Sequence, residues 1–446
     1  MPHQVDLLIH AEWIIPVVPE NQVLTHHTLA VTGGRIQAIL PRPEAEAEYQ
    51  ATHVFDLPGQ ALIPGLINTH THAAMSLLRG LADDLPLMTW LNEHIWPAES
   101  KWVNEEFIHD GTQMAIAEML LSGTTCFNDM YFYPDVTGRA ADQAGIRAVL
   151  GLITIDFPSA WASDGDEYIH KGLLVHDQFR NNPRIHCAFA PHAPYSVGDK
   201  ALKRIAVLAD ELEIPIHMHL HETHEEIVQG QQQHGNRPMQ RLYDLGLLSP
   251  ALTAVHMTHL EAHEIELFAS SGAHVVHCPE SNLKLASGFC PVTKLMEAGI
   301  NVALGTDGAA SNNDLDMFSE MHTAALLAKG VAEDASAVPA TKALEMATIN
   351  GAKALGLQET TGSLEVGKSA DMITVDLGQV STQPVYNPIS QLVYAVGREQ
   401  VSNVWVAGQQ LVSNHALTTL NEKRLIERAS NWAERISATD SGTRDS

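Results

Sequence analysis

Two histidines, His70 and His72, have the residue type and the spacing of a metal site. They follow the apolar run Ala61 to Ile67, which places them at the end of a predicted buried strand. Side chains two positions apart in a strand share a face, so both imidazoles are expected to point the same way. Such a pair supplies half of a first-row metal site, for which zinc is the usual ion. Isolated His-x-His pairs are also common in surface loops, so the rest of the chain must decide.

Ionisable residues follow several other apolar runs in the same manner. They are His192; His217, His219, His221 and Glu222; His256 and His259; and Asp307. Active sites of β/α barrels lie where strands end, so these side chains are predicted to meet. Three histidines and one aspartate would give nitrogen and oxygen ligands suited to zinc or iron.

Strand periodicity leaves two choices open within this group. His217, His219 and His221 share one strand face, so their spacing does not select a ligand among them. The sequence also does not decide which of His256 and His259 belongs to the site.

Eight strand-and-helix units must position these side chains. The predicted strands are 67–72, 124–130, 148–155, 185–192, 214–221, 252–259, 273–279 and 301–307. Helical patterns such as 105–122, 199–212, 261–271 and 315–329 lie between them. Eight such units across 65–360 predict an α/β fold, a closed (β/α)₈ TIM barrel.

The two ends of the chain predict a second, smaller domain. Short strand-like runs occur in 5–15, 29–40 and 54–57, and again in 362–377 and 401–412. We therefore expect 1–64 and 361–420 to form one β-sandwich domain. Residues 421–446 are expected to form an exposed helix and a frayed tail.

Composition limits the partners and the location. The formal charge of -27 disfavours nucleic acids and anionic membranes, which would be repelled. The start of the chain lacks the pattern of a secretory signal, and no run of about 18 apolar residues occurs, so a cytoplasmic protein is expected.

Four widely spaced cysteines suggest neither disulfides nor a thiolate metal site; they are expected to be buried. Nothing here locates an oligomer interface, which leaves a homo-oligomer open.

Longer motifs at these positions resemble the amidohydrolase superfamily, and within it the 5'-methylthioadenosine/S-adenosylhomocysteine deaminases. The resemblance covers nearly the whole chain. Its motifs are Pro64-Gly65-Leu66-Ile67-Asn68-Thr69-His70-Thr71-His72, His219-Leu220-His221-Glu222-Thr223, Ser281-Asn282-Leu283-Lys284-Leu285 and Leu304-Gly305-Thr306-Asp307-Gly308-Ala309-Ala310-Ser311-Asn312. It also includes Gly362-Ser363-Leu364-Glu365-Val366-Gly367-Lys368-Ser369-Ala370-Asp371, which resembles the return of the family chain into its β domain.

This resemblance implies a role for each candidate. The ligands of one zinc ion per subunit would be His70, His72, His219 and Asp307. The catalytic group would contain Asp307 again, Glu222 as a proton shuttle, and His256, rather than His259, as the partner of water. Glu99 and His192, together with Glu222 and Asp307, would contact the nucleoside substrate.

These roles describe a hydrolytic deamination at C6 of an adenosine-type nucleoside. Zinc lowers the pKa of water from 15.7 to about 7, which makes hydroxide available at neutral pH. Glu222 would protonate the purine N1, and protonation of the amine would then release ammonia.

One departure from the family bears on the substrate. Some relatives bind the carboxylate of S-adenosylhomocysteine with arginines in the stretch that corresponds to 150–171, which contains no arginine here. Phe157 and Trp161 in this stretch suit an apolar tail instead. We therefore expect 5'-methylthioadenosine to be preferred, with S-adenosylhomocysteine accepted less well.

Three other functions remain to be distinguished. A two-metal cyclic amidase normally carries a bridging lysine on strand four, and 185–192 has none. A deaminase of guanine or cytosine, or a triazine hydrolase, could use the same zinc ligands. A non-enzymatic barrel scaffold would be free to lose ligands, and none is missing.

Overall fold

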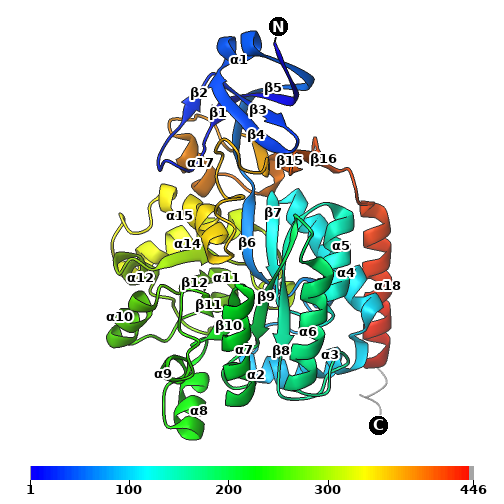
Figure 1. Cartoon of the computed structure of the whole chain (residues 1–446), viewed down its shortest axis with the longest axis vertical. Coiled ribbons are helices and arrows are strands. Elements are labelled where there is room, and N and C mark those ends of the chain that lie inside the picture. Colours follow the sequence, from blue (N-terminus) through cyan, green and yellow to red (C-terminus); the bar gives the residue numbers. More distant parts are fainter. Residues whose placement is uncertain (1, 441–446) are drawn as a thin grey trace. The chain divides into compact units, whose positions relative to one another are not determined.

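Eight parallel strands form the predicted barrel in the computed structural model, which describes residues 2–440 (Figure 1). In hydrogen-bonded order they run from β6 to β13 along the chain. Their bounds are β6 (Leu66–Thr71), β7 (Thr124–Asp129), β8 (Arg147–Thr154), β9 (Ile185–Pro191), β10 (Ile216–Leu220), β11 (Leu252–His256), β12 (His274–His277) and β13 (Asn301–Leu304). All eight predicted strands are therefore present, most of them one to three residues shorter than expected.

The first and last strands meet through bonds at their ends. The Asp307 amide donates to the His70 carbonyl at 3.0 Å, and the Thr69 hydroxyl donates to the Leu304 carbonyl. The barrel is therefore nearly closed, and the closing bonds lie beside the residues that suggested a metal site.

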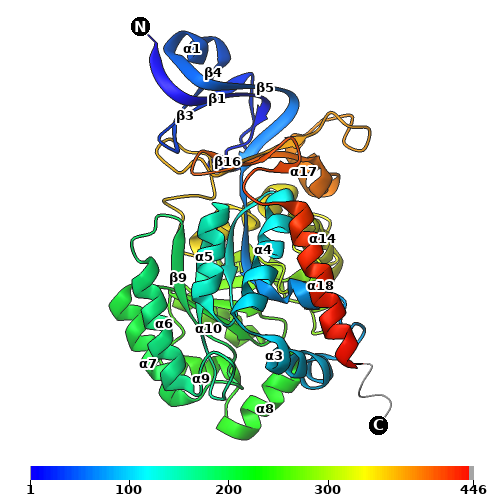
Figure 2. The ribbon, with the colours of Figure 1, turned by 90° about the vertical axis from the view of Figure 1, so that its right-hand side faces the viewer.

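Helices follow the strands, as expected for β/α units. Figure 2 shows α5, α6 and α7 on the outside of the sheet near β9. The helices of this region are η1 (Ala73–Leu78), α2 (Leu87–Trp90), η2 (Leu91–Ile95), α3 (Trp96–Trp102), α4 (Glu105–Leu121), α5 (Pro134–Ala144), α6 (Gly165–Phe179), α7 (Asp199–Leu212), α8 (His224–His234), α9 (Pro238–Asp244), α10 (Ala262–Ser271), α11 (Pro279–Lys284), α12 (Val292–Glu297) and α13 (Ala309–Asn312). They are followed by α14 (Met317–Ala332), α15 (Ala340–Met346) and α16 (Ile349–Ala354).

Both ends of the chain contribute to one further sheet. Its strands are β1 (His3–Ile14), β2 (Leu24–Thr25), β3 (His27–Thr32), β4 (Arg35–Pro41), β5 (Tyr49–Pro64), β14 (Met372–Asp376), β15 (Val401–Val406), β16 (Gln409–Ser413) and β17 (Ala416–Leu417), with α1 (Arg42–Glu48), α17 (Pro388–Tyr394) and η3 (Arg398–Gln400) between them. These nine strands form a single mixed sheet in which β5 pairs with β1 and β14. Side chains such as Ile9, Leu62 and Trp405 form its apolar core.

Contacts divide the chain into two compact units. One contains the described parts of Met1–Asn68, Met119–Cys126 and Asp316–Thr419, and the other those of Thr69–Glu118, Phe127–Leu315 and Leu420–Ser446. The second unit contains every residue singled out above for a chemical role. All four cysteines are free and buried, as predicted. No helix within residues 2–440 has both the length and the apolar character needed to span a membrane.

The carboxyl-terminal helix is present as predicted, and most of its described positions are exposed. Leu425, Trp432 and Ile436 on helix α18 (Glu422–Asp440) are instead buried. The Trp432 indole donates to Asp110 of α4, and Arg428 pairs with the same carboxylate at 2.9 Å. Helix α18 is therefore packed on α4 along one face. The expected frayed tail lies outside the described residues.

Candidate metal centre

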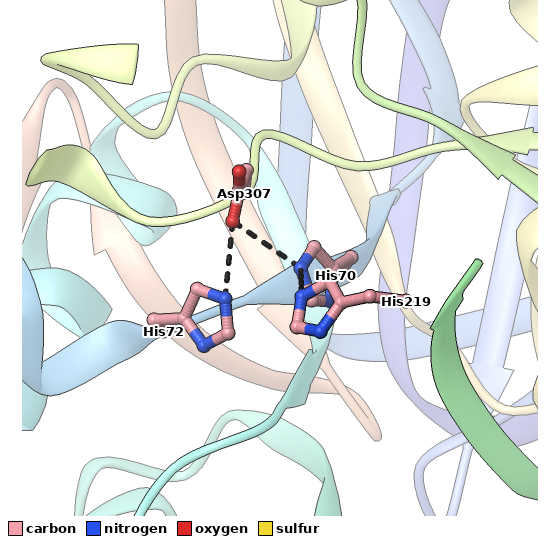
Figure 3. A group of neighbouring side chains, drawn as sticks. All are labelled: His70, His72, His219 and Asp307. Atoms are coloured by element: carbon pink, nitrogen blue, oxygen red, sulfur yellow. Dashed lines mark hydrogen bonds and ion pairs between the residues drawn. The ribbon is translucent and has the colours of Figure 1, made fainter. Parts of the chain in front are cut away.

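Four side chains from three strand ends converge on one point (Figure 3). His70 lies in β6 and His72 just after it, His219 lies in β10, and Asp307 follows β13. One ligand atom from each lies within 4.8 Å of the others. The Asp307 Oδ1 atom is 3.2 Å from Nε2 of His70 and 3.1 Å from Nε2 of His72, and the Nε2 atoms of His70 and His219 are 3.1 Å apart. This spacing suits ligands around a single cation.

The outer nitrogens of two rings are held by backbone carbonyls. Nδ1 of His72 lies 2.6 Å from the Met130 carbonyl, and Nδ1 of His219 lies 2.8 Å from the His192 carbonyl. A carbonyl only accepts, so each Nδ1 must carry the proton. The Nε2 lone pair of each ring is then free to face the cluster, as in known metal sites.

The three histidines of strand β10 have different partners. Nε2 of His217 contacts Nδ1 of His70 at 2.8 Å, so His217 supports a candidate ligand from behind. His221 contacts the His259 carbonyl through Nδ1, and its Nε2 accepts from the Met239 amide. His219 is therefore the strand β10 histidine whose ring nitrogen faces the cluster.

Asp307 is held with one oxygen toward the histidines. Its Oδ2 accepts hydrogen bonds from the Ser281 and Ser311 hydroxyls at 2.7 and 2.9 Å. Burial opposes ionisation of this carboxyl, but the adjoining rings of His70 and His72 outweigh burial and hold its pKa well below its usual range. A buried, ionised oxygen beside three ring nitrogens fits a divalent zinc or iron ion.

The backbone around Asp307 is strained and closely packed. Asp307 has a φ of 63°, a left-handed value that is uncommon for a residue with a side chain. A Cβ atom at Gly305 would lie 2.8 Å from the His70 amide nitrogen, so only glycine lets this segment approach His70. The local sequence therefore fixes the approach of Asp307 to the histidines.

The second open choice, between His256 and His259, also has a structural answer. Nδ1 of His256 contacts Oδ1 of Asn282 at 2.8 Å, and its Nε2 lies 3.8 Å from a carboxylate oxygen of Glu222. His259 instead contacts the Ser287 carbonyl through Nε2. The structure thus brings His256, and not His259, beside Glu222.

One pocket contains all the remaining candidate residues. Glu222, His256, Glu99 and His192 line it together with His72, His219 and Asp307. Burial raises the pKa of the Glu222 carboxyl, which shifts its equilibrium toward the protonated form. Much of the wall is apolar and comes from Leu87, Trp90, Leu91, Ile95, Trp96 and Phe157.

Glu99 comes from a helix rather than from the end of a strand. It lies on α3, and its Oε1 accepts a hydrogen bond from the Tyr131 hydroxyl at 2.7 Å. Desolvation raises the pKa of Glu99 to about 7, although the Tyr131 bond opposes the shift. Nδ1 of His192 contacts the Ser196 hydroxyl at 3.0 Å.

Sequence reasoning missed several partners and misplaced one. Tyr131 follows strand β7, so the rule that strand ends carry function would have included it. Ser311 and Asn282 lie within motifs of the family resemblance, but they were assigned no role, because short polar residues are common in turns. Phe157 lines the pocket as suggested, but Trp161 does not: its ring packs against Tyr168 with centroids 5.6 Å apart.

Known proteins resemble this chain over nearly its full length. A family model described as the amidohydrolase family matches residues 61–411. A relative from Teredinibacter turnerae, named 5-methylthioadenosine/S-adenosylhomocysteine deaminase, is 55% identical over 97% of this chain and 98% of its own. A crystal structure of an adenosine deaminase from Xanthomonas campestris with bound zinc is 51% identical, covers 98% of this chain and 100% of its own, and has a TM-score of 0.97. The atrazine chlorohydrolase TrzN from Arthrobacter aurescens shares the fold at 22% identity, with a TM-score of 0.90 over 96% of this chain and 100% of its own.

Proposed function

The chain belongs to the amidohydrolase family, and from this premise we propose that it deaminates adenosine-type nucleosides at C6. The preferred reaction converts 5'-methylthioadenosine to 5'-methylthioinosine and ammonia. S-adenosylhomocysteine is the second substrate. The observation that carries the proposal is one pocket in which a His/His/His/Asp cluster, Glu222 and Glu99 lie together.

We assign one zinc ion per chain to His70, His72, His219 and Asp307. Three ring nitrogens and a carboxylate form a donor set that zinc accepts, and iron is the alternative. When bound, the ion supplies Lewis acidity, which lowers the pKa of water toward 7.

Proton transfers then follow from the positions of three side chains. Asp307 accepts a proton from water as the oxygen adds to C6, and His256 orients that water. Protonated Glu222 donates to N1, which gives a tetrahedral carbon bearing OH and NH₂. Asp307 passes its proton to the amine, ammonia leaves, and the hydroxyl proton returns to Glu222.

The apolar wall supports the choice of nucleoside. No lysine or arginine is found among the described residues that line the pocket. A methylthio group matches Trp96 and Phe157, whose ring centroids lie 6.3 Å apart. The carboxylate of S-adenosylhomocysteine would lose water there without gaining a cation.

A substrate panel tests the proposed function. We expect ammonia release from 5'-methylthioadenosine with a kcat/KM at least about tenfold above that for S-adenosylhomocysteine, equivalent to about 1.4 kcal/mol. The panel should also contain adenosine, guanine and cytosine, assayed on protein of known metal content. Equal or faster turnover of S-adenosylhomocysteine would contradict the preference. Turnover of guanine or cytosine, with none of any nucleoside, would show that the protein is a free-base deaminase instead.

Glu99→Gln tests recognition of the ribose. If Glu99 accepts hydrogen bonds from the ribose hydroxyls, loss of its charge should raise KM for 5'-methylthioadenosine about 10- to 100-fold, the worth of a hydrogen bond to a charged group. Steady-state kinetics with the 2',3'-dideoxy analogue provide the comparison, because that analogue lacks the hydroxyls. A matched control is Glu93→Gln, on an exposed position of the same region. The same rise for the dideoxy analogue would show that Glu99 does not bind the ribose.

Other parts of the proposal rest on the sequence. A cytoplasmic location and the absence of nucleic-acid or membrane partners fit the charge of -27. A homo-oligomer stays open. We also retain the division into a barrel over 65–360 and a terminal domain from 1–64 and 361–420.

A further inference from the structure

Glu226 holds the backbone at the proposed proton shuttle. It lies in the first turn of α8, and only 4% of its surface is exposed. One carboxylate oxygen accepts the His221 amide at 2.9 Å, and the other accepts the Glu222 amide at 2.8 Å. A single buried carboxylate therefore binds two consecutive peptide N–H groups, one of which belongs to Glu222.

These two amides lie beyond the end of the strand. Strand β10 ends at Leu220, and His221 turns away with a left-handed φ of 53°. Buried amides need an acceptor, because an unpaired one is costly. Glu226 supplies acceptors for both from one side chain.

The same peptide segment is held from its carbonyl side. The Thr258 hydroxyl donates to the Glu222 carbonyl at 2.7 Å, and the Thr258 amide donates to the His221 carbonyl at 3.0 Å. The backbone of Glu222 is thus fixed by Glu226 on one side and by Thr258 on the other.

The Glu222 carboxyl depends on this support. Its contact with Nε2 of His256 is 3.8 Å, too long for a hydrogen bond, and the Ser287 side chain is its other polar neighbour, so much of its position must come from the backbone. We propose that Glu226 is a positioning residue that sets the reach of Glu222 toward the substrate base. The inference rests on the proposed deamination, in which Glu222 must approach N1 within hydrogen-bond distance.

Glu226→Gln keeps the shape of the side chain but removes one of the two oxygens that accept the His221 and Glu222 amides. An amide offers one acceptor oxygen, and its NH₂ group would face the second peptide N–H. A displacement of about 1 Å at a catalytic group costs about 100-fold in rate, so we expect kcat for 5'-methylthioadenosine to fall by that order. Bound zinc should stay within about threefold of wild type, because the four candidate ligands are unchanged, and the loss should fall on kcat more than on KM.

Two further variants separate positioning from general stability. Glu225→Gln makes the same change one residue earlier at an exposed position, and its kcat should match wild type. Glu226→Asp keeps both acceptor oxygens, so it should fold if Glu226→Gln does not, and its kcat should lie between those of Glu226→Gln and wild type. Thermal unfolding and zinc content are measured for each protein.

The decisive comparison removes Glu222 as well. If Glu226 acts through Glu222, substitution of Glu226 by Gln or Asp should lower kcat much less in a Glu222→Gln background than in wild type, since coupled effects do not add. An equal loss in both backgrounds overturns the inference, as does a Glu226→Gln kcat equal to that of Glu225→Gln. A wild-type protein that releases no ammonia from nucleosides would instead overturn the proposed function.

Discussion

Glu222→Gln is expected to keep its metal and to lose kcat by about 10²- to 10⁴-fold, the usual contribution of general acid–base catalysis. Glutamine has nearly the same shape, so the pocket and the His/His/His/Asp cluster should be unchanged. Its amide has no acidic proton to donate at neutral pH, and it is too weak a base to accept the proton of the hydroxyl on the tetrahedral carbon. Burial raises the pKa of the Glu222 carboxyl, which favours the acid form that the proposed step needs, and the substitution removes that acid.

The measurement is ammonia release under saturating 5'-methylthioadenosine, with zinc content determined on the same sample. KM should change little if the loss is confined to the proton-transfer step. Glu225→Gln, three residues away and exposed, is the matched control for the charge change. Near-normal turnover by Glu222→Gln with bound metal would show that another group moves the proton.

Much of the barrel was predictable because side chains two positions apart in a strand share a face, which applies to core residues and to metal ligands alike. The apolar run Ala61 to Ile67 predicted a buried strand before His70, and the structure divides it between the end of β5 and the start of β6, both of which are buried. His70 and His72 were predicted to share a face, and their Nε2 atoms do approach the same Asp307 oxygen. Strand-end placement also brought together residues as distant in sequence as His70 and Asp307.

Periodicity failed where the chain leaves the regular strand. His217, His219 and His221 share a face only while the backbone stays extended, and His221 turns at a φ of 53°. His256 also has a left-handed φ, 76°, which separates its direction from that of His259. Such turns depend on tertiary hydrogen bonds, so alternation along a sequence does not reveal them.

Tertiary packing also decided two features outside the cluster. Trp161 looked like part of an apolar substrate wall, but it packs on Tyr168 of the next helix. The last helix looked exposed because it is mostly polar, yet Trp432 is buried and donates to Asp110. A single aromatic residue in a polar helix gives a weak signal from sequence, since its partner lies far away along the chain.

His219→Ala is expected to remove both the metal and the activity. His219 supplies one of the four atoms in the cluster, and its ring is already aligned by the His192 carbonyl. Loss of an outer-shell partner alone typically weakens metal binding 10- to 100-fold, so loss of a ligand should exceed about 100-fold. Zinc measured by mass spectrometry after dialysis should fall well below one ion per chain, and kcat should fall with it.

The control must change a histidine without touching the cluster. His224→Ala, at the exposed start of α8, should retain wild-type zinc and turnover. Wild-type protein treated with a chelator should lose activity and regain it when zinc is added, which excludes unfolding as the cause.

If His219→Ala kept full zinc and full activity, His219 would not be a ligand. His217 and His221 would not easily replace it, because their Nε2 atoms already contact His70 and the Met239 amide.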